Sequence, residues 1–337
     1  MLRIVGDINF SDGYFDTGIG VGGKIKKGLS PFGRLQRKSD DYWIGNMECV
    51  CAEKSGNVGL KAKQFIISPQ HLNHIQHFDF YGVANNHVMQ HGAEAYQSML
   101  DYFDEKGVAY AGSNAKRTHV FEHQGKRVAL IAFCQRPDNF TESPLYWHMP
   151  ELEDVRAEIQ AHEDCDFRIA FVHWGNEFIS YPYIDQKQFA HALIDSGVNL
   201  VIGMHPHVMQ GCEQYKGQWI YYSLGNFVFN MPWEPTKYGL VVNVDLAAEP
   251  RIGYEYIKIG NDFCPEVVDD VPSKYSVEHL NTLLDINKEN EKYYAQVRRC
   301  NKLYRRVNRM DIIKNFFRMN PADSWGIVAE FIKKRLP

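Results

Sequence analysis

The chain has 337 residues, of which 45% are hydrophobic and 23% are charged, and these values are ordinary for a folded globular protein. A chain of this length can bury a large core, and it predicts about two domains. The formal net charge of −4 argues against a nucleic-acid-binding surface that extends over the whole chain.

The cysteines and the N-terminus indicate a cytoplasmic protein. The N-terminal sequence MLRIVGDINF enters an apolar strand at once and lacks the basic and apolar regions of a signal peptide. No window approaches the roughly 18 apolar residues that cross a bilayer. The cysteines form no CxxC pair or zinc-ribbon spacing, so we expect free thiols in a reducing compartment. They are Cys49, Cys51, Cys134, Cys165, Cys212, Cys264 and Cys300.

Short runs of β-branched and aromatic residues alternate with helical patterns. The runs, which predict buried strands, lie at residues 2–8, 41–48, 78–85, 127–134, 167–174 and 199–205. Residues 91–107 place Tyr96, Met99 and Phe103 on one stripe, as expected of a helix, and residues 185–197 repeat the pattern. Such alternation of strands and helices predicts an α/β fold.

The character of the chain changes from about residue 219. Three runs then follow one another as strands without an intervening helix, which predicts an antiparallel or mixed second half. These runs are residues 218–230, 239–247 and 251–260. After Pro272 the pattern is helical to the end of the chain. We therefore expect a main domain at residues 1–271 and a helical C-terminal extension at residues 272–337.

The C-terminal extension is strongly basic. Between residues 288 and 318 the acidic side chains are only Glu289, Glu291 and Asp311. The basic ones are Lys288, Lys292, Arg298, Arg299, Lys302, Arg305, Arg306, Arg309, Lys314 and Arg318. An apolar stripe at helical spacing consists of Tyr293, Val297, Cys300, Tyr304 and Val307. The extension either packs this stripe on the core and leaves a solvated basic face, or it approaches an anionic membrane or polymer.

Polar side chains follow six of the predicted strands at the point where each strand ends. They include Asp7 and Asn9, Glu48, Asn86 and His87, His173 and Glu177, His205 and His207, and Asn226. Taken alone, one such residue most simply forms part of a turn, caps a helix or lies in the interior with its hydrogen bonds made. Because α/β sheets place their sites at strand ends, six in one chain predict a shared site at one edge of one sheet.

The residue types indicate a pair of metal ions. Carboxylates, imidazoles and amides provide too many nitrogen and oxygen donors for one tetrahedral zinc, and they suit two divalent ions such as Mn²⁺, Zn²⁺ or Fe²⁺. Two ions about 3.5–4 Å apart generate a hydroxide nucleophile and hold the oxygens of a phosphoryl group. In an extended segment, residues i and i+2 project to one side. His205 and His207 would then each reach one ion, with Pro206 holding the segment extended, and Asp7 and Asn9 would face the site together.

The sequence resembles the poly-γ-glutamate capsule synthesis (CapA-like) family, a branch of the calcineurin-like metallophosphoesterase superfamily. The resemblance spans roughly residues 2–245. It rests on GDINF (6–10), NME (46–48), ANNH…HG (84–92), HWGNEF (173–178), GMHPHVMQGCEQYKG (203–217) and YSLGNFVFN (222–230). It implies a metallophosphatase-like four-layer α/β/β/α sandwich with two mixed sheets.

The resemblance also implies a role for each matching residue. The metal ligands would be Asp7, Glu48 as the bridging carboxylate, Asn86, His173, His205 and His207. His87 would be the general acid or the phosphate contact. Asn9 stands where many relatives in the superfamily have a histidine, and Gln90 stands where the family usually has an aspartate that supports His87. Glu177, Trp174 and Asn226 match family motifs and would at most support the ligands.

These observations predict a metallophosphoesterase-type hydrolase in the biosynthesis of capsule, exopolysaccharide or poly-γ-glutamate. Its substrate would be a phosphoester or an anionic polymer, and other capsule-synthesis proteins would be partners. Breaking poly-γ-glutamate itself would require amide chemistry. The alternative is a non-catalytic or weakly catalytic component of a capsule-assembly complex, which binds polymer or partner proteins through its metals or its basic C-terminal helices. Those helices could also contact a membrane surface peripherally.

Overall fold

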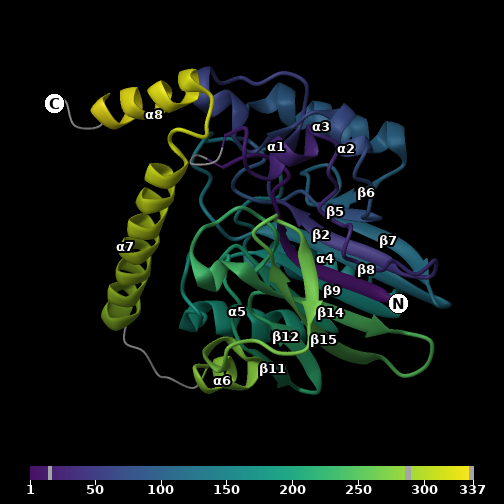
Figure 1. Ribbon diagram of the computed structural model, residues 1–337. Helices are drawn as coiled ribbons and strands as arrows, with labels where there is room; N and C mark the ends of the chain where they lie inside the picture. Colours follow the sequence, from purple (N-terminus) through teal and green to yellow (C-terminus); the bar gives the residue numbers. More distant parts are fainter. Residues whose placement is uncertain (14–16, 285–289, 334–337) are drawn as a thin grey trace.

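Two β-sheets pack face to face in the computed structural model, which describes residues 1–13, 17–284 and 290–333. Helices cover the outer face of each sheet, so the layers follow the order α/β/β/α (Figure 1). Both sheets contain parallel and antiparallel pairs. The predicted four-layer sandwich of two mixed sheets with a C-terminal helical extension is therefore confirmed.

The first sheet has the strand order β16-β15-β14-β1-β2-β5-β6, and β13 pairs with β1. Strands β1, β2, β5 and β6 run parallel. Strands β14, β15 and β16 are antiparallel to their neighbours, as the helix-free second half predicts. The bounds are β1 Leu2–Ile8, β2 Tyr42–Met47, β5 Phe80–Gly82, β6 Ala109–Ala111, β13 Asn226–Val228, β14 Tyr238–Asp245, β15 Arg251–Ile259 and β16 Pro265–Val268.

The second sheet has the strand order β11-β12-β10-β9-β8-β7. Its central strands β8, β9, β10 and β12 are parallel, and an antiparallel strand closes each edge. A separate pair joins β3 (Val50–Cys51) to β4 (Ile66–Ile67). The bounds are β7 Thr118–His123, β8 Lys126–Cys134, β9 Phe167–His173, β10 Leu200–Met204, β11 Cys212–Tyr215 and β12 Gln218–Tyr221.

The main core lies between the sheets, where Ile4 and Ile44 of the first sheet pack with Ile169 and Ile202 of the second. Two further clusters join each sheet to its helices. The predicted helix at 91–107 is α3, which buries its apolar stripe and ends at Gly107, where φ is +66°. The sheet-covering helices are α1 Val21–Ile25, α2 Pro69–Asn73, α3 Ala93–Lys106, α4 Leu152–Gln160 and α5 Ile184–Asp195, and short 3-10 turns are η1 Gly59–Lys63, η2 Glu234–Lys237 and η3 Ser273–Tyr275.

The C-terminal extension consists of α6 (Val277–Thr282), α7 (Asn290–Asn315) and α8 (Pro321–Lys333). Helix α6 is part of the core, because Val277 and Leu280 belong to the cluster between the sheets. The division at residue 272 stays a prediction. All seven cysteines are free thiols, as expected.

Helix α7 packs its apolar stripe against the loop that follows β9. Tyr293 is 1% exposed, and its hydroxyl accepts a hydrogen bond of 3.2 Å from Nδ2 of Asn176. Further along the helix, the ring of Tyr304 stacks on Phe178 at 4.0 Å between centroids. The extension is therefore docked on the sandwich by an apolar stripe, as one of the two interpretations of its sequence predicts.

Helix α8 packs against the segment around η1. Leu60 of η1 packs against Met319 and Ile327, and Nζ of Lys63 lies 2.6 Å from Oδ1 of Asp323. In Figure 1, α7 runs along one side of the sandwich, and α8 begins near its upper edge and reaches outward from it. Among the described residues, no helix is both long enough and apolar enough to cross a membrane.

Candidate metal centre

The candidate ligands lie at strand ends that come from both sheets. In the first sheet, Asp7 is the next-to-last residue of β1, and Glu48 and Asn86 follow β2 and β5. In the second sheet, His173 is the last residue of β9, and His205 follows β10. The expectation that all these residues lie at one edge of a single sheet is therefore wrong. The packed sheets present the carboxyl ends of their parallel strands to a common site, and the sequence pattern of a strand does not reveal which sheet it joins.

A close backbone approach at Gly6 brings the segment around β13 to this site. A Cβ atom at position 6 would lie 1.9 Å from the carbonyl oxygen of Gly225. The N–H of Asp7 donates to that same carbonyl at 3.1 Å. Any larger residue at position 6 would separate the two segments, so this glycine permits Asn226 to reach the site beside Asp7.

The segment His205-Pro206-His207 is a turn and not a continued strand. Strand β10 ends at Met204, and φ is +97° at His205 and +58° at His207. The expectation that Pro206 holds the histidines in an extended segment is therefore wrong. A non-glycine residue adopts positive φ at an energetic cost, so the surrounding structure must hold the turn. The turn directs both imidazoles into the site.

The side chains form two groups that share Glu48. One group joins Glu48 to His173 and His205, and the other joins Glu48 to Asp7 and His207. In each group the ligand atoms lie within 4.8 Å of one another. Oε1 of Glu48 is 3.8 Å from Nε2 of His173 and 3.6 Å from Nε2 of His207. Each group could hold a metal ion, and Glu48 is common to both.

The chemistry of Glu48 and His205 fits bound cations. Glu48 is fully buried, and within the described part of the chain neither of its carboxylate oxygens has a hydrogen-bond partner. Nε2 of His205 lacks a partner in the same way. Burial raises the pKa of Glu48 well above its usual range and lowers the pKa of His205 well below its own. Unpartnered buried groups of this kind cost stability unless an ion satisfies them.

Asp7 and His207 form the second pair of charges in the centre. Burial opposes the charge of Asp7, but the hydrogen bond and charge of His207 outweigh it and lower the pKa of Asp7. Burial likewise opposes the charge of His207, but the carboxylates of Glu48 and Asp7 raise its pKa to about 10. Asp7 and His207, 3.5 Å apart, therefore stabilise each other's charge inside the protein.

Asn226 and Asn46 orient the ligands. Nδ1 of His207 donates to Oδ1 of Asn226 at 3.0 Å, which leaves Nε2 to face Glu48. Nδ2 of Asn46 donates to Oδ1 of Asp7 at 2.8 Å and lies 3.2 Å from Nδ1 of His173. Sequence reasoning missed Asn46, although a buried amide at the end of β2 inside the NME motif was a usable signal. Such partners fix the orientation of metal ligands.

Asn86 and His87 lie together on the side of His173. Oδ1 of Asn86 is 2.7 Å from Nε2 of His173, which places the amide beside the first group. His87 stacks on Phe65 at 3.8 Å between ring centroids, and its Nδ1 donates to Oε1 of Gln90 at 2.9 Å. Gln90 therefore orients His87 although it carries no charge. Burial lowers the pKa of His87 to about 4.

Asn9, Trp174 and Glu177, which also match family motifs, have other contacts. Oδ1 of Asn9 accepts hydrogen bonds from the backbone and the hydroxyl of Ser11, so this oxygen is engaged locally, and a ligand role for Asn9 stays a prediction. Trp174 follows His173 directly, and its side chain packs in the core under the helices of the second sheet. There its Nε1 donates to the carbonyl of Tyr222 at 2.9 Å. Glu177 is half-buried and influences Glu48 and His207 only through its charge.

Comparison with known proteins identifies the family. The family model described as bacterial capsule synthesis protein PGA_cap matches residues 2–231. The capsule biosynthesis protein CapA of Bacillus anthracis is 29% identical over 235 residues, which cover 62% of this chain and 55% of that protein. The PGA biosynthesis protein CapA of Bacillus subtilis (strain 168) is 28% identical over 224 residues, covering 62% and 58%. The chain thus spans little more than half the length of these relatives.

Among solved structures, a 5′-nucleotidase from Candida albicans SC5314 aligns with 92% of this chain and 57% of its own, at 13% identity and a TM-score of 0.45. The family model is more informative, because it covers more than half of the chain and contains every candidate ligand from Asp7 to His207. The chain belongs to the family of bacterial capsule synthesis protein PGA_cap.

Proposed function

We propose that this protein is a metal-dependent hydrolase that acts in the synthesis of a bacterial capsule polymer. The observation that supports this most directly is the pair of three-residue groups that share Glu48. Neither oxygen of that buried carboxylate has a partner within the described residues. The ligand set of carboxylates and imidazoles suits Mn²⁺, Zn²⁺ or Fe²⁺.

In this proposal, Asp7, Glu48 and His207 hold one ion, and Glu48, His173 and His205 hold the other, with Asn86 beside the second. Two bound ions would supply Lewis acidity toward a phosphoryl oxygen and a water of lowered pKa. The chain provides a dry, buried frame for this chemistry, since these six side chains are at most 5% exposed. Burial of this kind strengthens every electrostatic interaction within the frame.

His87 is the candidate for proton transfer. Gln90 accepts the proton on Nδ1 of His87, so Nε2 faces the centre, 3.9 Å from Oε1 of Glu48. The side chain of His87 is 18% exposed, whereas those of Glu48 and His173 are at most 1% exposed. His87 therefore lies at the solvent side of the centre. In the neutral imidazole the proton sits on Nδ1, so Nε2 would first accept a proton from the attacking water and then pass it to the leaving oxygen.

The biological role follows from family membership, and the bond that is broken is a separate question. The relatives are described as proteins of capsule and PGA biosynthesis. Phosphoester hydrolysis is the reaction that a two-ion centre suits best. Cleavage of poly-γ-glutamate itself would be amide hydrolysis, which the same centre could support at a carbonyl carbon.

Metal analysis combined with a small-substrate panel tests the proposal. Purified protein is reconstituted with Mn²⁺, Zn²⁺ or Fe²⁺ and assayed on aryl phosphate monoesters, aryl phosphate diesters and poly-γ-glutamate. We expect two metal equivalents per chain and turnover of at least one phosphoester. His87→Ala should reduce kcat by roughly 10²–10⁴-fold at unchanged metal content. His74→Ala, which alters an exposed histidine at the end of α2, is the matched control. Protein that binds two ions but turns over none of these substrates would overturn the hydrolase and favour a binding role in capsule assembly.

A further inference from the structure

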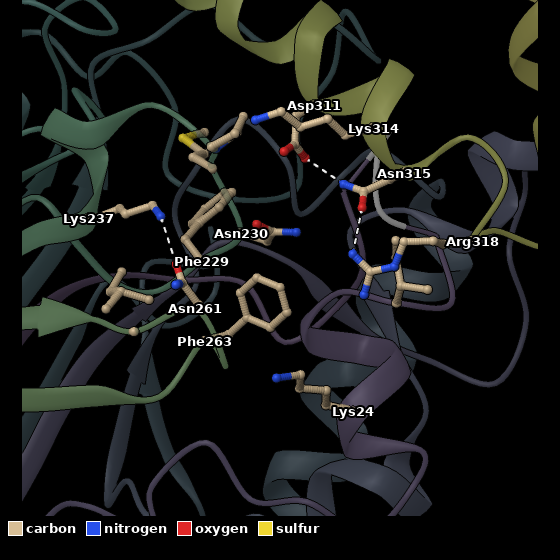
Figure 2. Close-up of a pocket in the computed structure, with 15 residues that line it drawn as sticks. Lys24, Phe229, Asn230, Lys237, Asn261, Phe263, Asp311, Lys314, Asn315 and Arg318 are labelled. Carbon is tan, nitrogen blue, oxygen red and sulfur yellow. Dashed lines mark hydrogen bonds between the residues drawn. The ribbon is translucent and has the colours of Figure 1, made fainter.

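A cavity of about 470 Å³ lies where α7 faces the turn between β15 and β16. Its walls come from α1, the segment after β13, that turn and the C-terminal end of α7 (Figure 2). A volume of this size is in the range of ligand-binding pockets. Most of the wall, from Lys237 onward, lies after residue 231 and therefore outside the part that the family model matches.

Four cationic side chains surround this pocket. Lys24 and Lys237 belong to the sandwich, and Lys314 and Arg318 belong to α7 and the residues just after it, as Figure 2 shows. The single carboxylate in the wall is Asp311, whose Oδ2 accepts from Nδ2 of Asn315 at 2.9 Å. Within the described part of the chain, none of the four cations has a carboxylate oxygen within 4.0 Å.

The hydrogen bonds of these cations engage neutral groups. Nζ of Lys237 donates to Oδ1 of Asn261 at 3.3 Å, and Arg318 donates to Oδ1 of Asn315 at 2.9 Å. The pocket therefore combines four positive charges with one negative charge. Like charges in one concave site repel one another and raise the local concentration of anions. An anionic ligand would relieve this repulsion.

Part of the remaining wall is apolar. Phe229 and Phe263 face the pocket together with Ile259, and Nζ of Lys24 lies 4.9 Å from the centroid of the Phe263 ring. Inorganic phosphate has no apolar part that could use such a wall. A chain that carries carboxylates on methylene-containing units would use both the cations and the aromatic rings.

The pocket adjoins the metal centre. The ring of Phe229, which lines the pocket, lies 4.9 Å from the ring of His207, a ligand candidate. The ring of Phe178 lies 6.2 Å from His207 on one side and stacks on Tyr304 of α7 on the other. One aromatic side chain therefore separates the cationic pocket from the centre, and α7 borders both.

We propose that this pocket binds the acidic groups of a carboxylate-bearing polymer beside the metal centre, and that Lys314 and Arg318 of the C-terminal extension supply half of its positive charge. The identification of the bound chain as substrate rests on the proposed function. The binding site itself does not, because it can be measured without metal and without turnover.

The test compares two charge-neutralising double variants of the full-length protein. Lys314→Gln with Arg318→Gln removes the contribution of the extension to the pocket. Lys302→Gln with Arg306→Gln is the matched control, because it removes a lysine and an arginine at the same spacing from exposed positions outside the pocket. Binding of fluorescent poly-γ-glutamate is measured by anisotropy in metal-free buffer at two salt concentrations. Competition with inorganic phosphate and sedimentation with anionic phospholipid vesicles are measured in parallel. Circular dichroism confirms the fold, and metal equivalents and aryl phosphate turnover are recorded for both variants.

We expect the pocket variant to bind poly-γ-glutamate roughly tenfold more weakly than the wild type, with a smaller salt dependence, while the control binds as the wild type does. Metal content and aryl phosphate turnover should be equal in both variants. Equal loss of polymer binding in the two variants would mean a general charge effect and would overturn the proposal that this pocket is the binding site. Binding of phosphate or vesicles in place of the polymer, or no polymer binding by the wild type, would overturn the proposed ligand while leaving the hydrolase to be judged by its own turnover.

Discussion

Replacing Glu48 with glutamine separates the metal-binding role of the centre from its role in folding. Glu48 is shared by both groups of ligands, and the described structure gives its buried oxygens no other partner. Glutamine keeps the shape of the side chain but cannot bridge two cations with a charged carboxylate. The metal-free protein should change little in stability, because burial already raises the pKa of Glu48 well above its usual range and disfavours the charge that glutamine lacks. What the variant loses is the charge interaction with His207 at 3.6 Å.

The expected magnitude follows from linkage between binding and unfolding. An ion at a hundredfold excess over its Kd stabilises the folded state by about 2.7 kcal/mol, so two ions contribute about 5.4 kcal/mol. Unfolding entropy is about 2.1 cal/mol/K per residue, which amounts to about 0.7 kcal/mol/K for 337 residues. Two ions should thus raise Tm by about 8 °C in the wild type, and Glu48→Gln should lose most of that increase.

Differential scanning fluorimetry with and without Mn²⁺ or Zn²⁺, together with metal analysis after desalting, measures both effects. Glu177→Gln is the control, because that carboxylate is near the centre but belongs to neither group. The control should keep two equivalents of metal and the full increase in Tm. If Glu48→Gln retained both, Glu48 would not bridge the ions, and the two groups would not be ion sites.

Three further changes test how the centre and the extension are held. Asn226→Ala should weaken metal binding roughly 10–100-fold, because His207 loses the acceptor that orients it at 3.0 Å; isothermal titration calorimetry measures this, and an unchanged Kd would contradict it. Gln90→Glu should raise the pKa of His87 from about 4 by roughly 1–3 units in metal-free protein, because a carboxylate then accepts from Nδ1 and stabilises the imidazolium; NMR titration would show no change if Gln90 were not its partner. Leu60→Ala should release α8 for proteolysis by weakening its docking by about 2 kcal/mol, whereas equal protease resistance would mean that other contacts hold the helix.

Strands and helices were predictable from the sequence because each has its own hydrophobic period. The run at 199–205 is β10, which ends one residue early at Met204 because the chain turns at His205 with φ of +97°. Strand β5 is shorter than the predicted run at 78–85, because the residues that carry Asn86 and His87 form turns. Which strands share a sheet was not predictable from periodicity, since it depends on long-range pairing.

The ligand candidates were predictable because they follow strands and match family motifs. Their partners were harder to find. Asn46 lies inside a motif, but only the fold shows that its amide bridges Asp7 and His173. The basic run that includes Lys314 and Arg318 was visible in the sequence, but the pocket that they line was not. Lys24 and Arg318 are far apart in the chain, and they border one cavity only because α7 docks beside α1.

The basic character of the C-terminal extension acquires a more specific meaning from the fold. On α7, Tyr304 faces the sandwich and stacks on Phe178, whereas Lys302 and Arg306 lie exposed beside it. Lys314 and Arg318 lie twelve residues further along the chain, where it meets the pocket. A uniform basic surface would bind any anion with similar strength at every position, but of these four cations only Lys314 and Arg318 line the pocket with Phe229 and Phe263. The position of a charge along the extension, and not the total charge, should therefore decide its effect on polymer binding.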